Sequence, residues 1–568
     1  MALSVLLPPA AAAQAPTPAL PPPALPVLPS REELDPAGRA VPRPEAEDLF
    51  APPVPAPCPF LGSGLSFRLE GVAFAGRRAD PDTRTEARIA AALEATYAEF
   101  LGREVPLETL CTIRDRATAA LFDLGRLARV EIPEQRIAEG RVRLEVIEAR
   151  VEAVRVIGVA GPVTHLVERT AARIRGMNPF DLRRAQRALL LASELPGVRL
   201  RTVIRPGASG RRGAIDIDML VERDPWQASF NFQNLQSRQT GRWAQLARLD
   251  AQSMTTLGEQ TTLVFYRTIE DDEQFVVQGR EVLRLNGDGL KLAAGLSYGE
   301  SRPGDVLEPL RLRATSVVGT LELAWPPVKE RMMEVELGAG LDIVSQRTLG
   351  PGFGRIVEDQ LRVLFARVAL ARRFRIGGTA GGLRIGQVSG ELQLRRGLAG
   401  LGASRPGDPF LSRLDGRADA LAARASAAAT LPVGTRVTLA LRGAAQLASG
   451  PLLAYEELTL GNLTVGRGYD PATVAGDEGA AGAVDLSLGP VPLVGRLAAS
   501  PYAFLDIGHV SNKDRGGFSE TLASGGAGVL LRAPGRLAVS IAWARPFSGA
   551  LGNPRPQDRL LLNATIGF

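Results

Sequence analysis

The residues of this sequence best suited to catalysis are a serine motif and two histidines. Residues 295–299 read Gly-Leu-Ser-Tyr-Gly, which matches the G-x-S-x-G motif, and His509 lies downstream in the order found in hydrolases. That motif needs a turn between a strand and a helix, whereas here an alternating strand simply continues. His165 has no evident catalytic partner, and two histidines supply too few ligands for zinc. The sequence therefore predicts no enzyme, no cofactor and no bound metal.

One acidic residue interrupts an otherwise apolar strand near the C-terminus. In the segment "YAFLDIGHV", Phe504, Asp506 and Gly508 share one face, and Leu505 and Ile507 share the other. An acidic side chain that faces lipid is costly, so the two aliphatic residues are expected to face lipid and Asp506 the interior of a barrel. An inward carboxylate of this kind needs a cation as its partner.

A loop earlier in the chain can supply that cation. Leu460–Gly479, "LGNLTVGRGYDPATVAGDEG", contains Arg467 between Gly466 and Gly468 and has no run that predicts a good helix or strand. The flanking glycines would let the backbone approach a wall closely. We expect the loop to fold inward and to pair Arg467 with Asp506, an interaction worth about 1 kcal/mol in a water-filled pore. The alternative is a loop that covers the outer mouth, with Arg467 in solvent.

The elements that would position these residues are strands. From residue 225 to residue 568, segments of about ten residues alternate between apolar and polar or small side chains, which is typical of a transmembrane β-barrel. In the last segment Leu560, Leu562 and Ile566 share one face with the terminal Phe568. We count about sixteen antiparallel strands, an even number as in single-chain bacterial barrels.

Residues 64–224 contain one β-α-α-β-β pattern twice. The first copy starts at "LSFRLEGVAF" and the second at "VEAVRVIGV", each followed by two amphipathic helices and two strands. The outer strands of such a unit can accept an extended peptide as an added strand. The alternative is that both units are spacers that hold something away from the membrane.

The N-terminal segment is predicted to direct export. Residues 1–13 have an apolar core and a small-residue cleavage site, although the usual basic residues are missing, and residues 14–57 form a proline-rich tether. Because the chain would be exported, the lone pair Cys58 and Cys111 is expected to form a disulfide.

The charge of the chain excludes some classes of function. The formal net charge is +6, and 64 of the 67 basic residues are arginine, because Lys291, Lys329 and Lys513 are the only lysines. The basic residues are scattered, so no nucleic-acid surface is predicted. No stretch is long and apolar enough for a membrane-spanning helix.

Taken together, these features resemble a known family, the outer-membrane transporters of two-partner secretion of the haemolysin and filamentous-haemagglutinin type. They belong to a superfamily of barrels that carry POTRA domains. The resemblance spans roughly residues 58–568. It rests on the two repeated units, the cysteine spacing and four motifs: Arg467-Gly468-Tyr469, Gly476-Asp477-Glu478-Gly479, Phe504-x-Asp506-x-Gly508 and the terminal Phe568. Two departures are Gly466, which the family loop commonly lacks, and the tether, which is too proline-rich to predict the pore-plugging helix of some members.

The resemblance implies transport and a domain plan. It divides the chain into a signal peptide (1–13), a periplasmic tether (14–57), POTRA domains (58–149 and 150–224) and a transmembrane barrel (225–568) whose loop 450–480 enters the pore. The POTRA domains would capture an unfolded exoprotein in the periplasm, and the barrel would conduct it outward. Phe568 would act as the signal for the barrel assembly machinery, and Tyr469 would pack beside Arg467. Alternatives are a related insertase of other barrels and a passive porin, which would lack POTRA domains.

Overall fold

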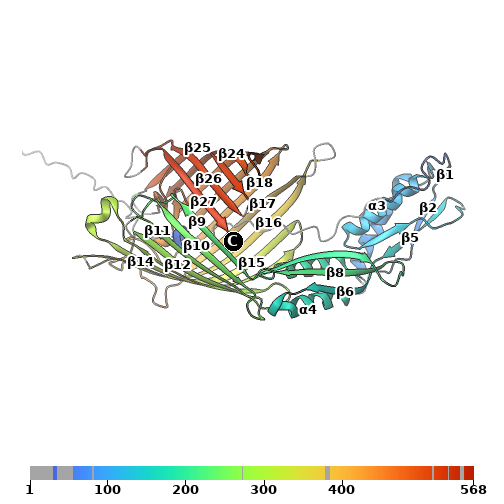
Figure 1. Cartoon of the computed structure of the whole chain (residues 1–568), viewed down its shortest axis with the longest axis horizontal. Helices are drawn as coiled ribbons and strands as arrows, with labels where there is room; N and C mark the ends of the chain where they lie inside the picture. The colour runs from blue at the N-terminus through green and yellow to red at the C-terminus, as the bar shows by residue number, and fades with distance from the viewer. Residues whose placement is uncertain are drawn as a thin grey trace, which may run out of the picture.

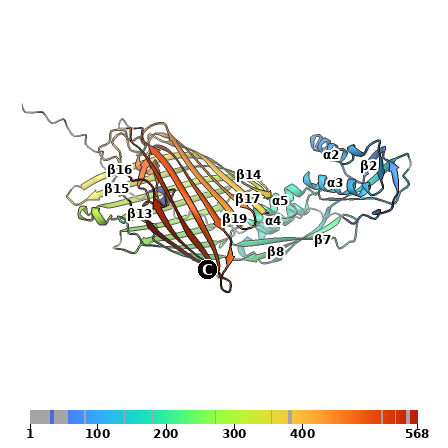
Figure 2. The ribbon, with the colours of Figure 1, turned by 90° about the horizontal axis from the view of Figure 1, so that it is seen from above.

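The computed structural model describes most of the chain: residues 30–34, 56–79, 82–137, 139–177, 180–270, 273–352, 354–377, 384–513, 517–534, 536–550 and 556–568. The predicted signal peptide and most of the predicted tether lie outside these ranges. Figures 1 and 2 show two α+β domains that follow one another from one end of a large barrel, with the second domain next to the barrel.

The first α+β domain surrounds one apolar core. Its elements are β1 (Ser66–Arg68), β2 (Gly71–Ala75), α2 (Thr83–Ala95), η2 (Ala98–Phe100), β3 (Glu104–Pro106), α3 (Thr109–Asp123), β4 (Ala128–Glu131) and β5 (Arg141–Glu148). The main sheet has the order β2-β5-β4, and β1 pairs with β3. Helix α2 begins where the Asp82 side chain accepts a hydrogen bond from the Thr85 amide at 3.0 Å. Residues such as Ile89, Ile113 and Leu144 then bury their side chains between the helices and the sheet.

The second α+β domain repeats the strand, two helices and two strands of the first, without a counterpart of the β1–β3 pair. It contains β6 (Arg150–Gly158), η3 (Gly161–Val163), α4 (Thr164–Arg175), α5 (Leu182–Ser193), β7 (Val198–Pro206) and β8 (Ala214–Arg223). The sheet order is β6-β8-β7, with β6 and β8 parallel. The amide of Arg184 is capped by Asp181 at 3.0 Å, and the apolar face of α5 packs on the sheet around Leu189 and Ile217.

The rest of the described chain forms a closed antiparallel barrel. Its strands are β9 (Trp226–Gln233), β10 (Ala244–Gln252), β11 (Gln260–Thr268), β12 (Gln274–Arg284), β13 (Lys291–Ser301), β14 (Arg313–Lys329), β15 (Met333–Gly350), β16 (Gly354–Ile376), β17 (Arg384–Gly397), β18 (Leu421–Val433), β19 (Val437–Ala448), β22 (Glu478–Leu488), β23 (Val491–Pro492), β24 (Ala498–Ser511), β25 (Ser519–Ala533), β26 (Leu537–Pro546) and β27 (Arg559–Gly567). Strands β22 and β23 both pair with β24 and together count as one strand of the wall, so the barrel has sixteen strands. The predicted fold class is confirmed.

Alternation along the strands separates the two faces of the wall. Leu505 and Ile507 on β24 are exposed on the outside, whereas Asp506 between them is buried in the interior. The barrel closes where β27 pairs with β9, and the amide of Phe568 donates to the Ala228 carbonyl at 2.8 Å. Among the described residues, no helix is long and apolar enough to cross a membrane.

Candidate functional site

The candidate site is the interior of the barrel, which the chain between β19 and β22 enters. This segment, called the pore loop below (residues 449–477), contains η5 (Ala454–Glu456), β20 (Leu458–Leu460) and β21 (Val474–Gly476). No sequence pattern predicted β20 and β21, which are only three residues long. They pair with each other and form a sheet separate from the barrel. The pore loop is therefore held in the interior by side chains and loop contacts, not by joining the wall.

Arg467 lies at the tip of the pore loop and binds Asp506 on β24. Its Nε and Nη2 donate to the two carboxylate oxygens at 3.0 and 2.6 Å, and its backbone amide donates to Oδ2 at 2.8 Å. Its Nη1 reaches Asp485 on β22 at 2.6 Å. The guanidinium also lies over the Phe504 ring, 3.7 Å from the centroid.

Burial makes this contact stronger than a pair in a wet pore. The side chain of Arg467 is 17% exposed and that of Asp506 only 1%. Removing one member of a buried pair typically costs about 3–5 kcal/mol, because the other charge stays behind without compensation. The expectation of about 1 kcal/mol was for a pair in a water-filled pore, whereas both side chains of this pair are largely buried, and Arg467 is not in solvent.

Asp485 and Phe504 complete the site, although sequence reasoning assigned no role to Asp485. Val484 and Leu486 on β22 are exposed on the outer face, so Asp485 faces inward. The same alternation that marked Asp506 would have marked this second carboxylate. Arg442 on β19 binds the other oxygen of Asp485 at 2.8 Å, so two arginines balance two aspartates here.

Two glycines of the predicted motifs allow the pore loop to lie close to the wall. A Cβ on Gly468 would lie 2.8 Å from the Pro546 nitrogen and 2.8 Å from the Cβ of Ser524. A Cβ on Gly508 would lie 2.8 Å from a methyl carbon of Leu460. Contacts this short exclude side chains at both positions without displacement of the neighbours.

Tyr469 fixes the other side of the loop tip. Its hydroxyl contacts the Ala523 and Ser548 carbonyl oxygens, each at 2.9 Å, and its ring lies in an apolar cluster with Leu460 and Val474. Arg559 on β27 donates to the Tyr469 carbonyl oxygen. The tip is thus fastened to β24, β25 and β27 by three neighbouring residues.

Asp477 holds the end of the pore loop where β22 begins. Its buried carboxylate accepts from the amides of Leu452 at 2.6 Å and Lys513 at 2.7 Å. It also binds Arg413, in the connection between β17 and β18, at 2.7 Å. A Cβ on the preceding Gly476 would meet the Ser511 carbonyl oxygen at 2.9 Å. This motif therefore joins the pore loop to two neighbouring connections.

A second buried ion cluster lies deeper in the interior, and no sequence motif pointed to it. Arg395 on β17 donates to Asp342 on β15 and to both oxygens of Glu456 in η5, each at 2.8 Å. Arg424 on β18 also reaches Glu456, at 3.3 Å. These contacts attach the first half of the pore loop to wall strands β15, β17 and β18.

Part of the predicted tether also lies in the interior. The short helix α1 (Arg31–Leu34) contacts β12 and β13, and Arg31 lines an interior pocket with Glu391 and Gln393. Figure 1 shows this segment inside the barrel. Residues 30–34 of the tether thus lie in the pore, a possibility that the sequence left undecided.

The remaining predicted residues do not contact the pore loop. Cys58 and Cys111 form a disulfide between the end of the tether and α3. Nearby, Arg114 donates to the carbonyl oxygens of Ala56 and Pro57. The G-x-S-x-G residues lie within β13 and are followed by more strand, and His509 bonds only Thr521. No group of three metal-binding side chains occurs within the described ranges.

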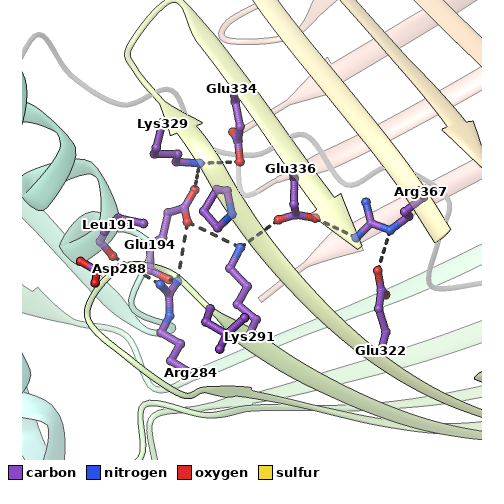
Figure 3. Close-up of polar contacts among 12 residues, drawn as sticks. Leu191, Glu194, Arg284, Asp288, Lys291, Glu322, Lys329, Glu334, Glu336 and Arg367 are labelled. Atoms are coloured by element: carbon purple, nitrogen blue, oxygen red, sulfur yellow. Dashed lines mark hydrogen bonds and ion pairs between the residues drawn. The ribbon is translucent and has the colours of Figure 1, made fainter. Parts of the chain in front are cut away.

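An ion network joins the second α+β domain to the barrel (Figure 3). Glu194, at the end of α5, binds Lys329 of β14 and lies 3.7 Å from Lys291 and 3.9 Å from Arg284. The Nζ atom of Lys291 also forms an ion pair with Glu336 on β15, at 3.4 Å. Burial alone would raise the pKa of Glu194, but the charges of Lys291 and Lys329 outweigh it and hold the pKa below its ordinary value of 4.5.

Comparisons with solved structures show which barrels this chain resembles. CdiB from Escherichia coli is 18% identical, with a TM-score of 0.68 over 95% of this chain and 96% of that one. CdiB from Acinetobacter baumannii is 13% identical, with a TM-score of 0.64 over 89% of this chain and 90% of that one. Among curated proteins, no sequence matches this chain.

Family comparisons cover both parts of the chain. Residues 70–149 match the POTRA domain of ShlB type, and residues 380–531, which include the pore loop and β24, match the haemolysin secretion/activation protein ShlB/FhaC/HecB. This is a family of secretion transporters, so the barrel lies in the outer membrane and the preceding domains lie in the periplasm. The chain therefore contains a ShlB-type POTRA domain followed by an outer-membrane barrel with a haemolysin secretion/activation domain, as its sequence motifs predicted.

Proposed function

We propose that this protein captures an unfolded exoprotein in the periplasm and conducts it through the barrel to the cell surface or medium. The observation that carries the proposal is the way the pore is filled. The sheet of β20 and β21 is separate from the wall, so the pore loop can leave the interior without breaking the strand pairing of the barrel. A pore blocked by a releasable loop suits passage of an extended chain.

Capture is assigned to the outer strands of the two POTRA sheets. In the second domain, β6 and β7 are the outer strands, and within the described ranges no other strand pairs with their free sides. A partner in extended form can hydrogen-bond to such an edge as an additional strand. No nucleotide is required, since folding of the exported chain outside would make its passage irreversible.

Two further partners are included in the proposal. Outer-membrane lipid would surround the exposed apolar band of the wall, which includes Leu505 and Ile507. The barrel assembly machinery would recognise the last strand, whose terminal Phe568 is exposed beside β9.

Photocrosslinking in cells tests the capture step. A photoreactive residue in place of the exposed Arg201 on β7 is expected to crosslink to the N-terminal part of an exported protein. The same residue in place of Arg184, on the exposed side of α5, serves as the control. Crosslinking from the helix alone would contradict capture by strand addition.

Deletion of the gene tests the transport step. Loss of one large protein from the medium, with normal amounts of other outer-membrane barrels, is the expected result. If the other barrels disappeared instead, insertion of barrels would be the primary function and transport would be rejected.

A further inference from the structure

The outward face of β13 to β16 carries a row of charged residues just beyond the apolar band. Below the row, Leu296, Leu321, Ile343 and Leu364 are exposed on the four strands and form the surface that faces lipid. The row lies at the end of these strands far from Lys291 and Glu194, and hence at the extracellular side. It therefore lies where the outer leaflet changes from acyl chains to headgroups.

Strand register places these residues in one row that runs across the four strands. Glu300 pairs with Thr315, Thr315 with Arg347, and Arg347 with Glu358. Neighbouring strands are about 4.8 Å apart, so three steps separate the two glutamates by about 14 Å. Exposed Val317, the next outward residue of β14 below Thr315, marks the upper edge of the apolar band. The row is thus an extended feature across four strands.

At one end of the row, a buried glutamate holds two exposed arginines. Glu300 binds Arg302 at 2.8 Å and Arg313 at 2.7 Å. The carboxylate side chain is 5% exposed, whereas the arginines are 59% and 52% exposed. Without the shared carboxylate the two guanidinium groups would repel each other, so Glu300 keeps them side by side at the surface.

The same arrangement recurs at the other end. Glu358 binds Arg347 at 2.8 Å and also Arg355. The glutamate is 20% exposed, and the arginines are 48% and 46% exposed. Each guanidinium has five N–H groups and uses only part of them on the glutamate, which leaves donors available to an outside ligand.

The two clusters together have four guanidinium groups and two carboxylates, an excess of positive charge at the headgroup level. Planar guanidinium groups are the preferred protein partners of phosphate, which they bind with two parallel hydrogen bonds. The outer leaflet of this membrane offers phosphate on the lipid A disaccharide of lipopolysaccharide. We propose that these two clusters form a binding site for lipid A phosphates on the β13–β16 side of the barrel.

The opposite side of the barrel provides an internal comparison. Arg545 on β26 shares the outer face with exposed Trp543 and binds Asp558 at 3.0 Å. In this ion pair one arginine meets one carboxylate, so the pair itself carries no excess charge. A site for phosphate is accordingly assigned to the β13–β16 side and not to this one.

Binding of lipopolysaccharide to the purified, folded full chain tests the proposal. Native mass spectrometry in detergent, titrated with a short-core lipopolysaccharide, measures the fraction bound for the wild type, for Arg313→Gln/Arg347→Gln and for Arg545→Gln. The double variant is expected to bind at least about tenfold more weakly, since it loses one charged contact to phosphate in each cluster. Arg545→Gln should bind like the wild type, and a dephosphorylated lipid should bind wild type and double variant equally weakly.

Three outcomes would overturn the proposal. The first is equal binding of lipopolysaccharide by the double variant and the wild type, and the second is a loss of binding in Arg545→Gln as large as that in the double variant. The third is binding of phosphatidylglycerol by the wild type as strong as its binding of lipopolysaccharide, which would indicate a general attraction for anions. Heat modifiability in gel electrophoresis reports whether each variant is folded. If the first double variant does not fold, Arg302→Gln/Arg355→Gln, which removes the other arginine of each cluster, replaces it with the same expected loss.

Discussion

Replacement of Arg467 by alanine should release the pore loop and leave the barrel folded. Three bonds join this residue to Asp506, and only the one from the backbone amide survives the change. The contact with Asp485 and the stacking on Phe504 are lost as well. The wall should persist, because β24 remains paired along its length with β22 and β25.

The size of the effect follows from burial. Asp506 is almost fully buried, so leaving it without its cation costs about 3–5 kcal/mol in the loop-in state. At 1.4 kcal/mol per tenfold change, the population ratio of loop-in to loop-out falls by about two to three and a half orders of magnitude. The loop-out state is therefore populated more often in the variant than in the wild type.

Secretion and channel conductance measure the consequence. We expect a higher mean conductance of the purified protein in planar bilayers. We also expect much less exoprotein in the medium per amount of heat-modifiable barrel, because transport is proposed to use a loop that alternates between two positions and this variant favours only one of them. Arg467→Lys retains the charge but not the paired hydrogen bonds, and should be intermediate. In Arg467→Ala/Asp506→Ala the buried charge is gone, so the loss should be less than the sum of the single variants.

Two results would refute this reasoning. Wild-type secretion by both Arg467→Ala and Asp506→Ala would show that the contact has no role in transport. Loss of the folded barrel from the membrane would show that the pore loop serves assembly.

Further predictions concern the periplasmic part of the chain. Replacing Cys58 and Cys111 with serine opens a loop of 53 residues and should destabilise the first POTRA domain by about 4 kcal/mol, measured by thermal unfolding; an unchanged melting temperature would contradict this. Lys329→Ala removes the nearest partner of Glu194 and should speed hydrogen exchange at the end of α5, whereas Lys513→Ala, at the other end of the barrel, should not. The pKa of Glu194 is lowered in the folded protein, so its contribution to this junction is complete above pH 4.5 and declines as the pH falls through the lowered pKa. Hydrogen exchange at the end of α5 should therefore also rise on acidification. Exchange that is independent of pH, after correction for intrinsic rates, would exclude this role.

The architecture could be predicted from the sequence because each element depends on a local pattern. Alternation along β24 and β27 distinguishes lipid-facing from inward positions, since successive side chains of a strand point to opposite faces. Two amphipathic helices between strands, present twice, indicate the α+β domains. The inward position of Asp506 followed from the same rule, because an acidic residue among aliphatic ones can only be accommodated on the inner face.

The sequence could not determine which residues distant in the chain contact one another. Arg395 meets Glu456 and Asp342 only because the closed barrel brings β15, β17 and the pore loop around one interior. Likewise, Glu194 meets Lys329 only because α5 docks against the end of β14. Local alternation gives the face of each residue but neither the order of strands around the barrel nor the depth of a loop within it. Those depend on closure of the whole wall, and closure decides which buried charges neutralise one another.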